Sequence, residues 1–149
     1  MKIMIPMAGK SQRFLDEGFR DPKPFIKVEG KPMIVNIIEI FKGEGEFIFI
    51  CNKNHKIAKN LAKIVEPYIT KYKIVFIDEH SKGPVYSISK VFDLINDNEP
   101  VIINYCDFSC YWDFNHFKEW NNKSNLDGSI TAYKGFHPHS LGKDNYAFL

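Results

Sequence analysis

Two basic residues in the first part of the chain could bind the phosphates of a nucleotide. Arg13 follows a short apolar run, and Lys23 stands between Pro22 and Pro24. A guanidinium is a planar fork of donors suited to bidentate phosphate contact, whereas an ammonium is a compact point charge, held here on a backbone that the two prolines restrict. We therefore expect Arg13 and Lys23 to play different parts in holding phosphate.

A loop of small residues separates the apolar run from Arg13. Residues 2–7 are predicted to form a short buried strand, and small residues after it would let backbone N–H groups approach phosphate oxygens closely. An apolar strand followed by Ala-Gly and a polar loop also occurs in many α/β domains without this function, so that alternative stays open. The nucleotide-binding residues predicted here are Met7, Ala8, Gly9, Lys10 and Ser11.

A carboxylate follows another apolar run near residue 101. The run Val-Ile-Ile-Asn-Tyr-Cys ends directly before Asp107, and a carboxylate at the tip of a buried strand is well placed to hold Mg²⁺ against phosphate oxygens. A lone aspartate also commonly caps a turn. Asn104, inside the run, could orient this site or be a satisfied polar residue of the strand. Asp107 is therefore the best single candidate for a metal ligand, with a turn cap as the more common role of a lone aspartate, and Asn104 is a candidate nucleotide-binding residue.

Two further positions could contact the nucleoside. Gly83 precedes an expected helix and would let the backbone come close to a base or ribose. Asn52 follows an expected strand, and ordinary turn chemistry is its equal alternative. We expect His80 to be a surface loop residue rather than a catalytic base, and His137 and His139 to belong to a substrate-facing loop rather than to a metal site.

The composition describes a globular chain without a general affinity for polyanions. A chain of 149 residues with 44% hydrophobic content fits one domain, 1–149, with a real core. A net charge of +2 gives no broad field for nucleic acid. Cys51 and Cys106 lie in apolar runs, which predicts reduced, buried thiols in a cytoplasmic protein. Since the apolar runs are too short to span a bilayer, we expect no membrane partner.

Apolar runs alternate with helical patterns along the chain. This alternation predicts an α/β fold with a mostly parallel sheet, helices on both faces, and ligands beyond the carboxyl ends of the strands. Most of the candidate residues follow predicted strands and should meet at that edge. The predicted strands are 2–7, 46–51, 73–78 and 101–105, and the predicted helices are 33–41, 55–65 and 85–95.

The segments described above resemble the sugar-phosphate nucleotidyltransferases. In that family an opening strand, a glycine-rich loop, an arginine and a Pro-Lys pair match Met7-Ala8-Gly9, Arg13 and Pro22-Lys23 in order. The resemblance runs along the whole chain and is greatest to a branch linked to capsule and surface-polysaccharide genes, through VIINYCDF, YWDF and GFHPHSLGKDNYAFL. The chain departs from the family at Ser11, where a second loop glycine is usual, and at Pro84, where small residues are usual.

The resemblance implies a three-layer Rossmann-like fold of the nucleotide-diphospho-sugar transferase type. Members usually continue further, so it also implies that the C-terminal part is lacking. The activity implied is that of an enzyme that transfers a nucleoside monophosphate from an NTP to a sugar 1-phosphate or similar phosphorylated acceptor, with release of pyrophosphate. Arg13 would hold the β- and γ-phosphates, Lys23 the α-phosphate, and Asp107 the Mg²⁺ ion.

Two other functions remain as alternatives. One is a non-catalytic or incomplete nucleotide-binding module. The weaker one is a nucleotide-sugar-dependent glycosyltransferase, which typically carries Asp-x-Asp, whereas this chain has Asp107-Phe108-Ser109. The partners expected are an NTP and a phosphorylated sugar-type acceptor, without nucleic acid or membrane, and a homo-oligomer is left open.

Overall fold

The computed structural model describes residues 1–9, 14, 16–19, 21–41, 43–53, 57–96, 98–132 and 134, without the side chains of residues 58 and 59. Contacts divide the chain into two compact units, Met1–Trp112 and Asp113–Leu149. Each unit is described by itself. The single domain expected from the sequence stays a prediction.

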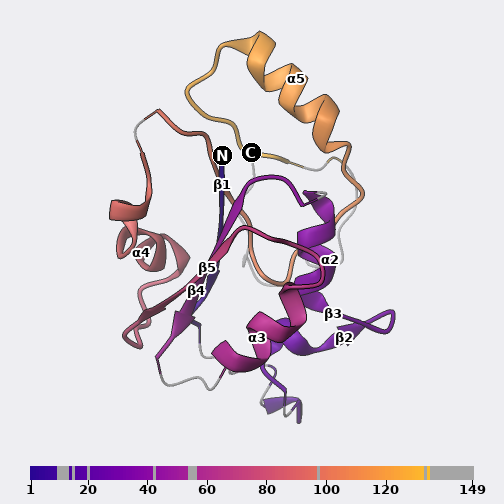
Figure 1. Ribbon diagram of the computed structural model, residues 1–149, viewed down its shortest axis with the longest axis vertical. Coiled ribbons are helices and arrows are strands. Elements are labelled where there is room, and N and C mark those ends of the chain that lie inside the picture. Colours follow the sequence, from indigo (N-terminus) through magenta and orange to yellow (C-terminus); the bar gives the residue numbers. More distant parts are fainter. Residues whose placement is uncertain are drawn as a thin grey trace. The chain divides into compact units, whose positions relative to one another are not determined.

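Four parallel strands form the sheet of the first unit (Figure 1). Their order is β5-β4-β1-β6, so β1 lies between β4 and β6. The chain therefore moves outward from β1 through β4 to β5, and then crosses back to the other side of β1. The strands are β1 (Lys2–Met7), β4 (Glu46–Asn52), β5 (Tyr72–Ile77) and β6 (Val101–Ile103).

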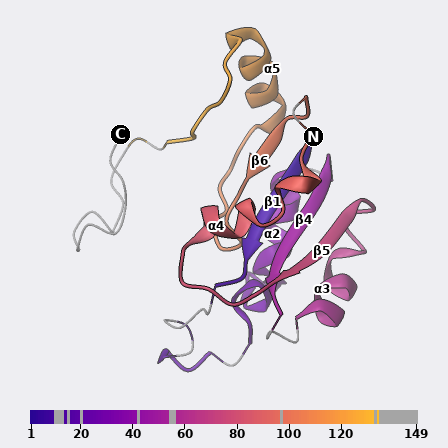
Figure 2. The same cartoon turned by 90° about the vertical axis from the view of Figure 1, so that its left-hand side faces the viewer.

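Helices cover both faces of this sheet. Helices α2 (Met33–Ile40) and α3 (Ala58–Val65) lie on one face, and the short α4 (Pro84–Ser89) lies on the other (Figures 1 and 2). This three-layer α/β arrangement confirms the fold class predicted from the alternation of strands and helices. It is Rossmann-like, with a parallel sheet whose connections run through helices.

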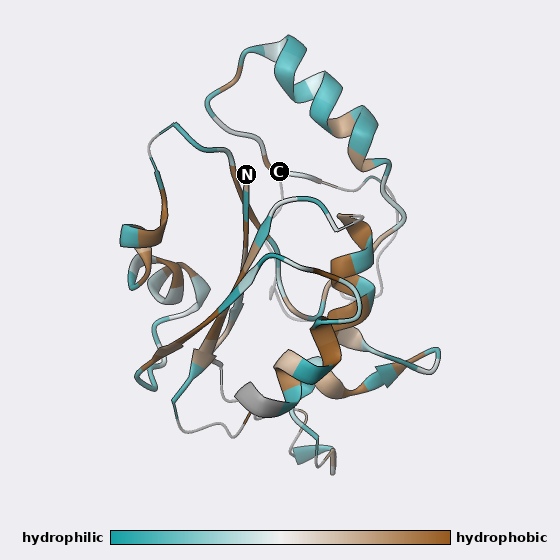
Figure 3. Cartoon of the chain, viewed as in Figure 1, coloured by the Kyte–Doolittle hydropathy of each residue, from teal (hydrophilic) through white to brown (hydrophobic). Residues whose placement is uncertain are grey.

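The central strands are buried along nearly their whole length because both faces are covered. Successive side chains point to opposite faces. Met4 and Ile48 pack with Ile88 of α4 in one cluster. Phe47, one position before Ile48, points to the other face, where its ring centroid lies 6.0 Å from that of Phe41 after α2. Hydrophobic residues are accordingly concentrated in the strands and on α2 (Figure 3).

A small hairpin fills the connection between β1 and α2. It consists of β2 (Lys27–Val28) and β3 (Lys31–Pro32), preceded by the 3₁₀ helix η1 (Lys23–Phe25). The two turn residues, Glu29 and Gly30, have positive φ values of 52° and 82°. That pair of values is typical of a type I′ turn, whose twist suits a two-residue hairpin. The hairpin was not predicted, because Glu-Gly is a weaker turn signal than Asn-Gly.

Some predicted boundaries were wrong. The helix expected at 85–95 ends at Ser89 and is followed by the 3₁₀ helix η2 (Phe92–Leu94). Val91 has φ −131° and ψ 22°, which is not helical, and its side chain is buried in the cluster around Ile88. The strand expected at 101–105 ends at Ile103. The predicted start of α3 at 55 lies outside the described residues.

The described part of the second unit contains α5 (Phe114–Ser124). The helix begins at a capping residue, since the Asp113 carboxylate accepts a hydrogen bond of 3.0 Å from the backbone N–H of His116. It ends at Asn125, which has a left-handed backbone with φ 47°. Among the described residues of both units, every helix is too short or too polar to cross a membrane.

Candidate active site

The strand order reverses between β1 and β6, and this position brings two loops together. The connection from β1 leads away towards α2 on one side of the sheet, whereas β6 lies on the other side of β1. In open α/β sheets the crevice at such a reversal, outside the carboxyl ends of the strands, is the usual ligand site. The loop after β1 carries Lys23, and the loop after β6 carries Asp107.

Lys23 and Asp107 form an ion pair between these two loops. The Lys23 side chain is 16% exposed and the Asp107 side chain is 34% exposed, so the pair lies at the margin of the protein rather than in bulk solvent. The ammonium also lies 4.7 Å from the centroid of the Phe14 ring. A desolvated cation next to an aromatic face and a carboxylate is held in a narrow range of positions.

Local backbone geometry explains the position of Lys23. Pro22 and Pro24 fix φ on either side of it, and the backbone N–H of Phe25 donates to the Pro22 carbonyl over 2.8 Å to form η1. The N–H of Ile26 then donates to the Lys23 carbonyl over 3.3 Å. These bonds stabilise the turn that presents Lys23, which supports the expectation of a restricted lysine.

Asn104 stabilises the turn that carries Asp107. Its side-chain Nδ2 donates to the carbonyl oxygens of Tyr105 at 2.7 Å and Phe108 at 3.3 Å. Its backbone N–H donates to the Met4 carbonyl over 3.1 Å, which attaches the start of the turn to β1. The side-chain amide of Asn104 therefore forms its hydrogen bonds within the loop. The structure thus assigns Asn104 a role in the shape of the site, and a direct contact to nucleotide stays a prediction.

The start of the predicted nucleotide loop lies beside β4. Met7 and Ala8 are buried, at 5% and 1% exposure, so only their backbone is available to a ligand. Asn52 is fully buried, and its Nδ2 lies 3.5 Å from the Ala8 carbonyl oxygen, to which it donates. Gly9 is exposed, with open space where a side chain would be. Asn52 thus joins the ends of β1 and β4, the position at which the loop begins.

Gly83 lies in a different connection, between β5 and α4. Its φ of 83° and ψ of 175° belong to a region that is essentially limited to glycine. Because β5 is separated from β1 by β4, Gly83 is at the same carboxyl edge of the sheet as Asp107 but over other strands. The predicted residues Lys10, Ser11 and Arg13, together with His137 and His139, lie outside the described residues, and their roles stay predictions.

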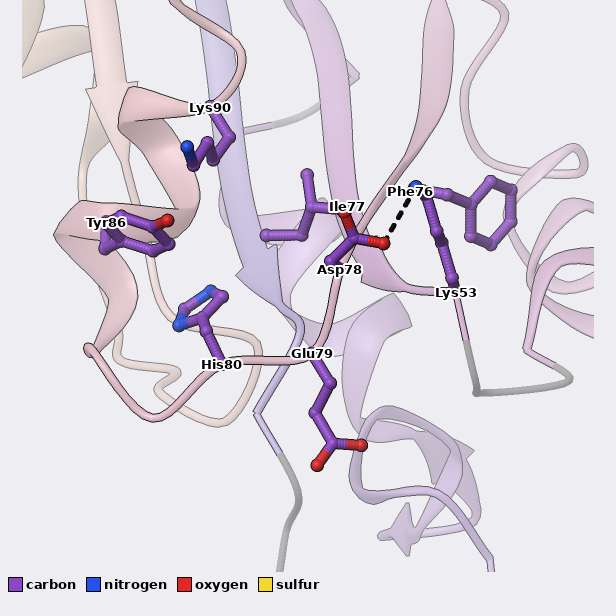
Figure 4. Close-up of a pocket in the computed structure, with 8 residues that line it drawn as sticks. All are labelled: Lys53, Phe76, Ile77, Asp78, Glu79, His80, Tyr86 and Lys90. Carbon is purple, nitrogen blue, oxygen red and sulfur yellow. Dashed lines mark ion pairs between the residues drawn. The ribbon is translucent and has the colours of Figure 1, made fainter.

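A second feature at this edge is a pocket of about 280 Å³ beside the end of β5 (Figure 4). Residues of β5, the loop after it and α4 line the pocket, and Lys53 closes one side through an ion pair of 2.9 Å with Asp78. Sequence reasoning missed this pocket and missed the contact of Phe14 with Lys23, because both depend on tertiary contacts.

The donor set can be compared with what a metal ion requires. Among the residues that the structure describes, no group of three or more His, Cys, Asp and Glu side chains comes together. Mg²⁺ is commonly bound by one or two carboxylates, with substrate phosphates and water completing its shell. Asp107 therefore suits an ion that arrives with phosphate, and it does not form a preassembled protein cage.

The cysteines near the site are poor nucleophiles. Burial raises the pKa of the Cys106 thiol to about 12, and the negative charge of the adjacent Asp107 acts in the same direction. Burial also raises the pKa of Cys51 to about 12. Both thiols stay protonated near neutral pH, so neither supplies a thiolate for covalent chemistry or metal binding.

Comparison with known proteins gives the class to which this fold and site belong. The sequence profile of the MobA-like NTP transferase domain matches residues 3–113. That match covers most of the first unit, including the loops that carry Lys23 and Asp107. The chain therefore belongs to the MobA-like NTP transferase family.

Two curated relatives match nearly the whole chain. It is 25% identical to the mannose-1-phosphate guanyltransferase of Yarrowia lipolytica over 95% of this chain and 40% of that protein. It is 27% identical to the bifunctional protein GlmU of Thermosipho africanus over 96% of this chain and 30% of that protein. This chain thus spans less than half the length of these two relatives.

Solved structures show the same fold. The nucleoside-diphosphate-sugar pyrophosphorylase of Vibrio cholerae RC9 superposes with a TM-score of 0.59 and 19% identity, over 77% of this chain and 52% of that one. At this level of identity the likeness establishes the fold and leaves the substrate open.

Proposed function

We propose that this chain transfers a nucleoside monophosphate from an NTP to a sugar 1-phosphate, or a similar phosphorylated acceptor, and releases pyrophosphate. The observation that carries the proposal is the Lys23–Asp107 ion pair at the point where the strand order reverses. Family membership and the named activities of the relatives support the same reaction.

The proposed reaction needs charge stabilisation rather than a protein nucleophile. The acceptor phosphate is already ionised and attacks the α-phosphorus of the NTP, while the bond from this phosphorus to the bridging oxygen of pyrophosphate breaks. Negative charge collects on the α-phosphate and on the leaving group as this occurs. A fixed cation at the α-phosphate stabilises that charge more in the transition state than in the ground state.

Among the described residues, Lys23 is the cation that we propose for the α-phosphate. In the structure its ammonium is neutralised by Asp107 and lies over the face of the Phe14 ring. We infer that Lys23 exchanges the carboxylate for an α-phosphate oxygen when the nucleotide binds. Arg13 is proposed to hold the β- and γ-phosphates, and its bidentate fork suits that task.

Asp107 is proposed to bind Mg²⁺ once Lys23 has turned to the phosphate. Its carboxylate is partly exposed, and the Asn104 hydrogen bonds fix the turn that presents it. The ion would screen the phosphate charges and bring donor and acceptor oxygens together. Asn104 is thereby a positioning residue for the proposed metal ligand.

The nucleoside is proposed to lie along the edge formed by the β1 loop and the β5–α4 connection. The backbone at Met7, Ala8 and Gly9 would contact the nucleotide on the phosphate side, and Gly83 would contact the base or ribose. Lys10 and Ser11 extend the first set. Asn52 is proposed to act through the Ala8 carbonyl that it holds, because its own side chain is fully buried.

We further propose that the product serves the synthesis of capsule or surface polysaccharide in the cytoplasm. The resemblance to that branch of the family supports the first part. Two buried cysteines and one exposed cysteine, all three free thiols, are compatible with a reducing compartment.

The experiment is pyrophosphate release measured for a matrix of NTPs against a panel of sugar 1-phosphates with Mg²⁺. The variants Lys23→Ala and Asp107→Ala are compared with the unaltered chain. Lys31→Ala is the matched control, because Lys31 also forms an ion pair, with Glu39 at 2.7 Å, but on an exposed surface. We expect turnover for one pairing, reduced about 10²- to 10³-fold in each site variant and unchanged in the control.

Silence across the panel would reject the transferase. If calorimetry then still detected NTP binding that is weakened by Lys23→Ala, a nucleotide-binding module would be the better account. Silence in both assays would remove the nucleotide function altogether.

A further inference from the structure

His80 lies on the wall of the pocket beside β5, between the end of the strand and α4 (Figure 4). It was expected to be an ordinary loop residue. In the structure, however, both of its ring nitrogens make hydrogen bonds within one short segment, and these bonds connect the loop before Gly83 to the helix after it.

The hydrogen bonds determine which nitrogen carries the proton. The backbone N–H of Lys82 donates to Nδ1 of His80 over 3.2 Å, so Nδ1 must be an unprotonated acceptor. The proton of the neutral ring is therefore on Nε2, which lies 2.9 Å from Oγ of Ser87 and donates to it. Ser87 is only 3% exposed, so this second bond reaches into the protein. His80 is thus a neutral ring in a single tautomer.

The two hydrogen bonds of His80 lie next to a constrained backbone position, Gly83. Gly83 has a backbone conformation essentially limited to glycine, and the N–H of Ser87 donates back to the Gly83 carbonyl over 3.4 Å. The loop 80–83 and the first turn of α4 therefore form one closed unit, with His80 as the side chain that bridges its two ends.

The other side chains of the pocket belong to α4 and to the ends of β4 and β5. The Tyr86 ring is edge-on to His80, with centroids 4.7 Å apart, and the ammonium groups of Lys82 and Lys90 lie 4.7 and 4.8 Å from the Tyr86 centroid. The remaining charged groups are the ion pair of Lys53 with Asp78, and Glu79. No nucleophile or metal cluster adjoins His80 among these lining residues.

We propose that His80 is a positioning residue whose Nε2-protonated ring holds the Lys82–Gly83 backbone in the shape that receives the nucleoside, so that nucleotide affinity falls when the acceptor for the N–H of Lys82 is lost. Without the acceptor at Nδ1, the hydrogen bond that fixes the loop is absent. This inference rests on the proposed function, because it assigns the Gly83 loop to the nucleotide.

The first test is independent of any ligand. Nitrogen-15 spectra of the full chain report the tautomer of His80, and the amide signals of Lys82 and Gly83 report the loop. We expect the Nε2–H tautomer, and hydrogen exchange of the Lys82 amide that is faster in His80→Gln, which lacks its acceptor, than in His80→Asn, which keeps one. An Nδ1–H tautomer, or equal exchange in the two variants, would overturn the proposal.

The second test measures the affinity of the NTP selected by pyrophosphate release, by calorimetry. Two variants separate the two hydrogen bonds. His80→Asn places an amide oxygen near the position of Nδ1 and keeps an acceptor for Lys82, whereas His80→Gln places an amide nitrogen near Nε2 and keeps only a donor for Ser87. We expect about fivefold weaker binding for His80→Gln than for the unaltered chain, and we expect His80→Asn to recover most of this loss.

His116→Asn is the matched control, since it deletes a histidine from α5 and should keep the original affinity. Equal affinity of His80→Gln and the unaltered chain would overturn this inference alone. Absence of nucleotide binding in the unaltered chain would refute the proposed function and the affinity claim together.

Discussion

Lys23 and Asp107 stabilise each other only moderately. Their side chains are 16% and 34% exposed, so water screens part of the attraction. Ion pairs that water screens typically contribute up to about 1 kcal/mol to stability. Removal of either partner should therefore affect stability little, whereas the proposed phosphate site requires both.

We predict that Lys23→Ala and Asp107→Asn each change the free energy of unfolding by about 1 kcal/mol or less. The same changes should reduce turnover by about 10²- to 10³-fold. Urea unfolding followed by circular dichroism measures the first quantity, and pyrophosphate release the second. A loss of several kcal/mol with a proportionate loss of activity would show that the pair is structural.

The sequence predicted which residue types would form the site, but it did not predict the contacts between them. Lys23 was identified from its two prolines and Asp107 from the apolar run before it, and the structure brings the two together. The role of Asn104 could not be read from the sequence, because it depends on the turn geometry that places the Tyr105 and Phe108 carbonyls near its amide. The contact of Phe14 with Lys23 depends in the same way on the path of the loop.

The β5–α4 connection is the element whose conformation depends most on one residue. Gly83 has φ 83° and ψ 175°, and a side chain added there would meet no atom within 4 Å. The cost of substitution is therefore backbone strain alone. We predict that Gly83→Ala lowers the free energy of unfolding by about 1–3 kcal/mol.

Gly128→Ala is the control for this prediction, since Gly128 also has open space around it but no positive φ. Thermal or urea unfolding of both variants gives the comparison. Equal stability of the two variants would mean that the strained conformation of Gly83 is not required by the fold. If Gly83→Ala also weakens NTP binding, the nucleoside role of this connection gains support.

Three strands were predicted to within one residue at either end, whether they are buried along their length, as β1 and β4 are, or only in part, as β5 is. The helix prediction ran past Ser89 because the apolar pattern continues through Val91, although Val91 leaves the helical conformation while staying in the core. Periodicity detects burial, and burial persists where the helix has ended.

On the scale of the molecule, the end of the sheet opposite the site carries its own charged cluster. Lys2 at the start of β1 lies 3.1 Å from the Glu46 carboxylate at the start of β4 and 3.3 Å from that of Glu99. The hydrogen bond from Lys2, with a smaller contribution from Lys73, lowers the pKa of Glu46. The bond to Glu46, and then that to Glu99, raises the pKa of Lys2.

These shifts predict how stability depends on pH. Because the pKa of Glu46 is lowered on folding, its contribution is complete above the ordinary carboxyl pKa and is lost as the pH falls through the lowered value. Because the pKa of Lys2 is raised, its contribution is complete below the ordinary lysine value and is lost as the pH rises through the raised one. Stability from this cluster is therefore greatest across the neutral range.

We predict that Lys2→Met destabilises the chain near neutral pH and that the difference from the unaltered chain shrinks below about pH 4. Urea unfolding at a series of pH values measures this difference. A difference that stays constant down to pH values where carboxylates are protonated would show that Lys2 acts through packing rather than through its charge.

The order of the strands could not be predicted from the sequence, although the parallel sheet could. The βαβ alternation indicates parallel neighbours, but it does not say that β6 returns to the far side of β1. That return brings together the loops that carry Lys23 and Asp107. The central claim is that the chain transfers a nucleotidyl group at this position.

The most direct test follows two labels through the reaction with the acceptor that supports pyrophosphate release. An NTP labelled at the α-phosphate and the same NTP labelled at the γ-phosphate are incubated separately with the chain, Mg²⁺ and the sugar 1-phosphate. Our account predicts the α label in a sugar nucleotide and the γ label in pyrophosphate, with both signals strongly reduced in Lys23→Ala. Transfer of the γ label to the sugar phosphate, or release of the γ label as inorganic phosphate, would contradict it.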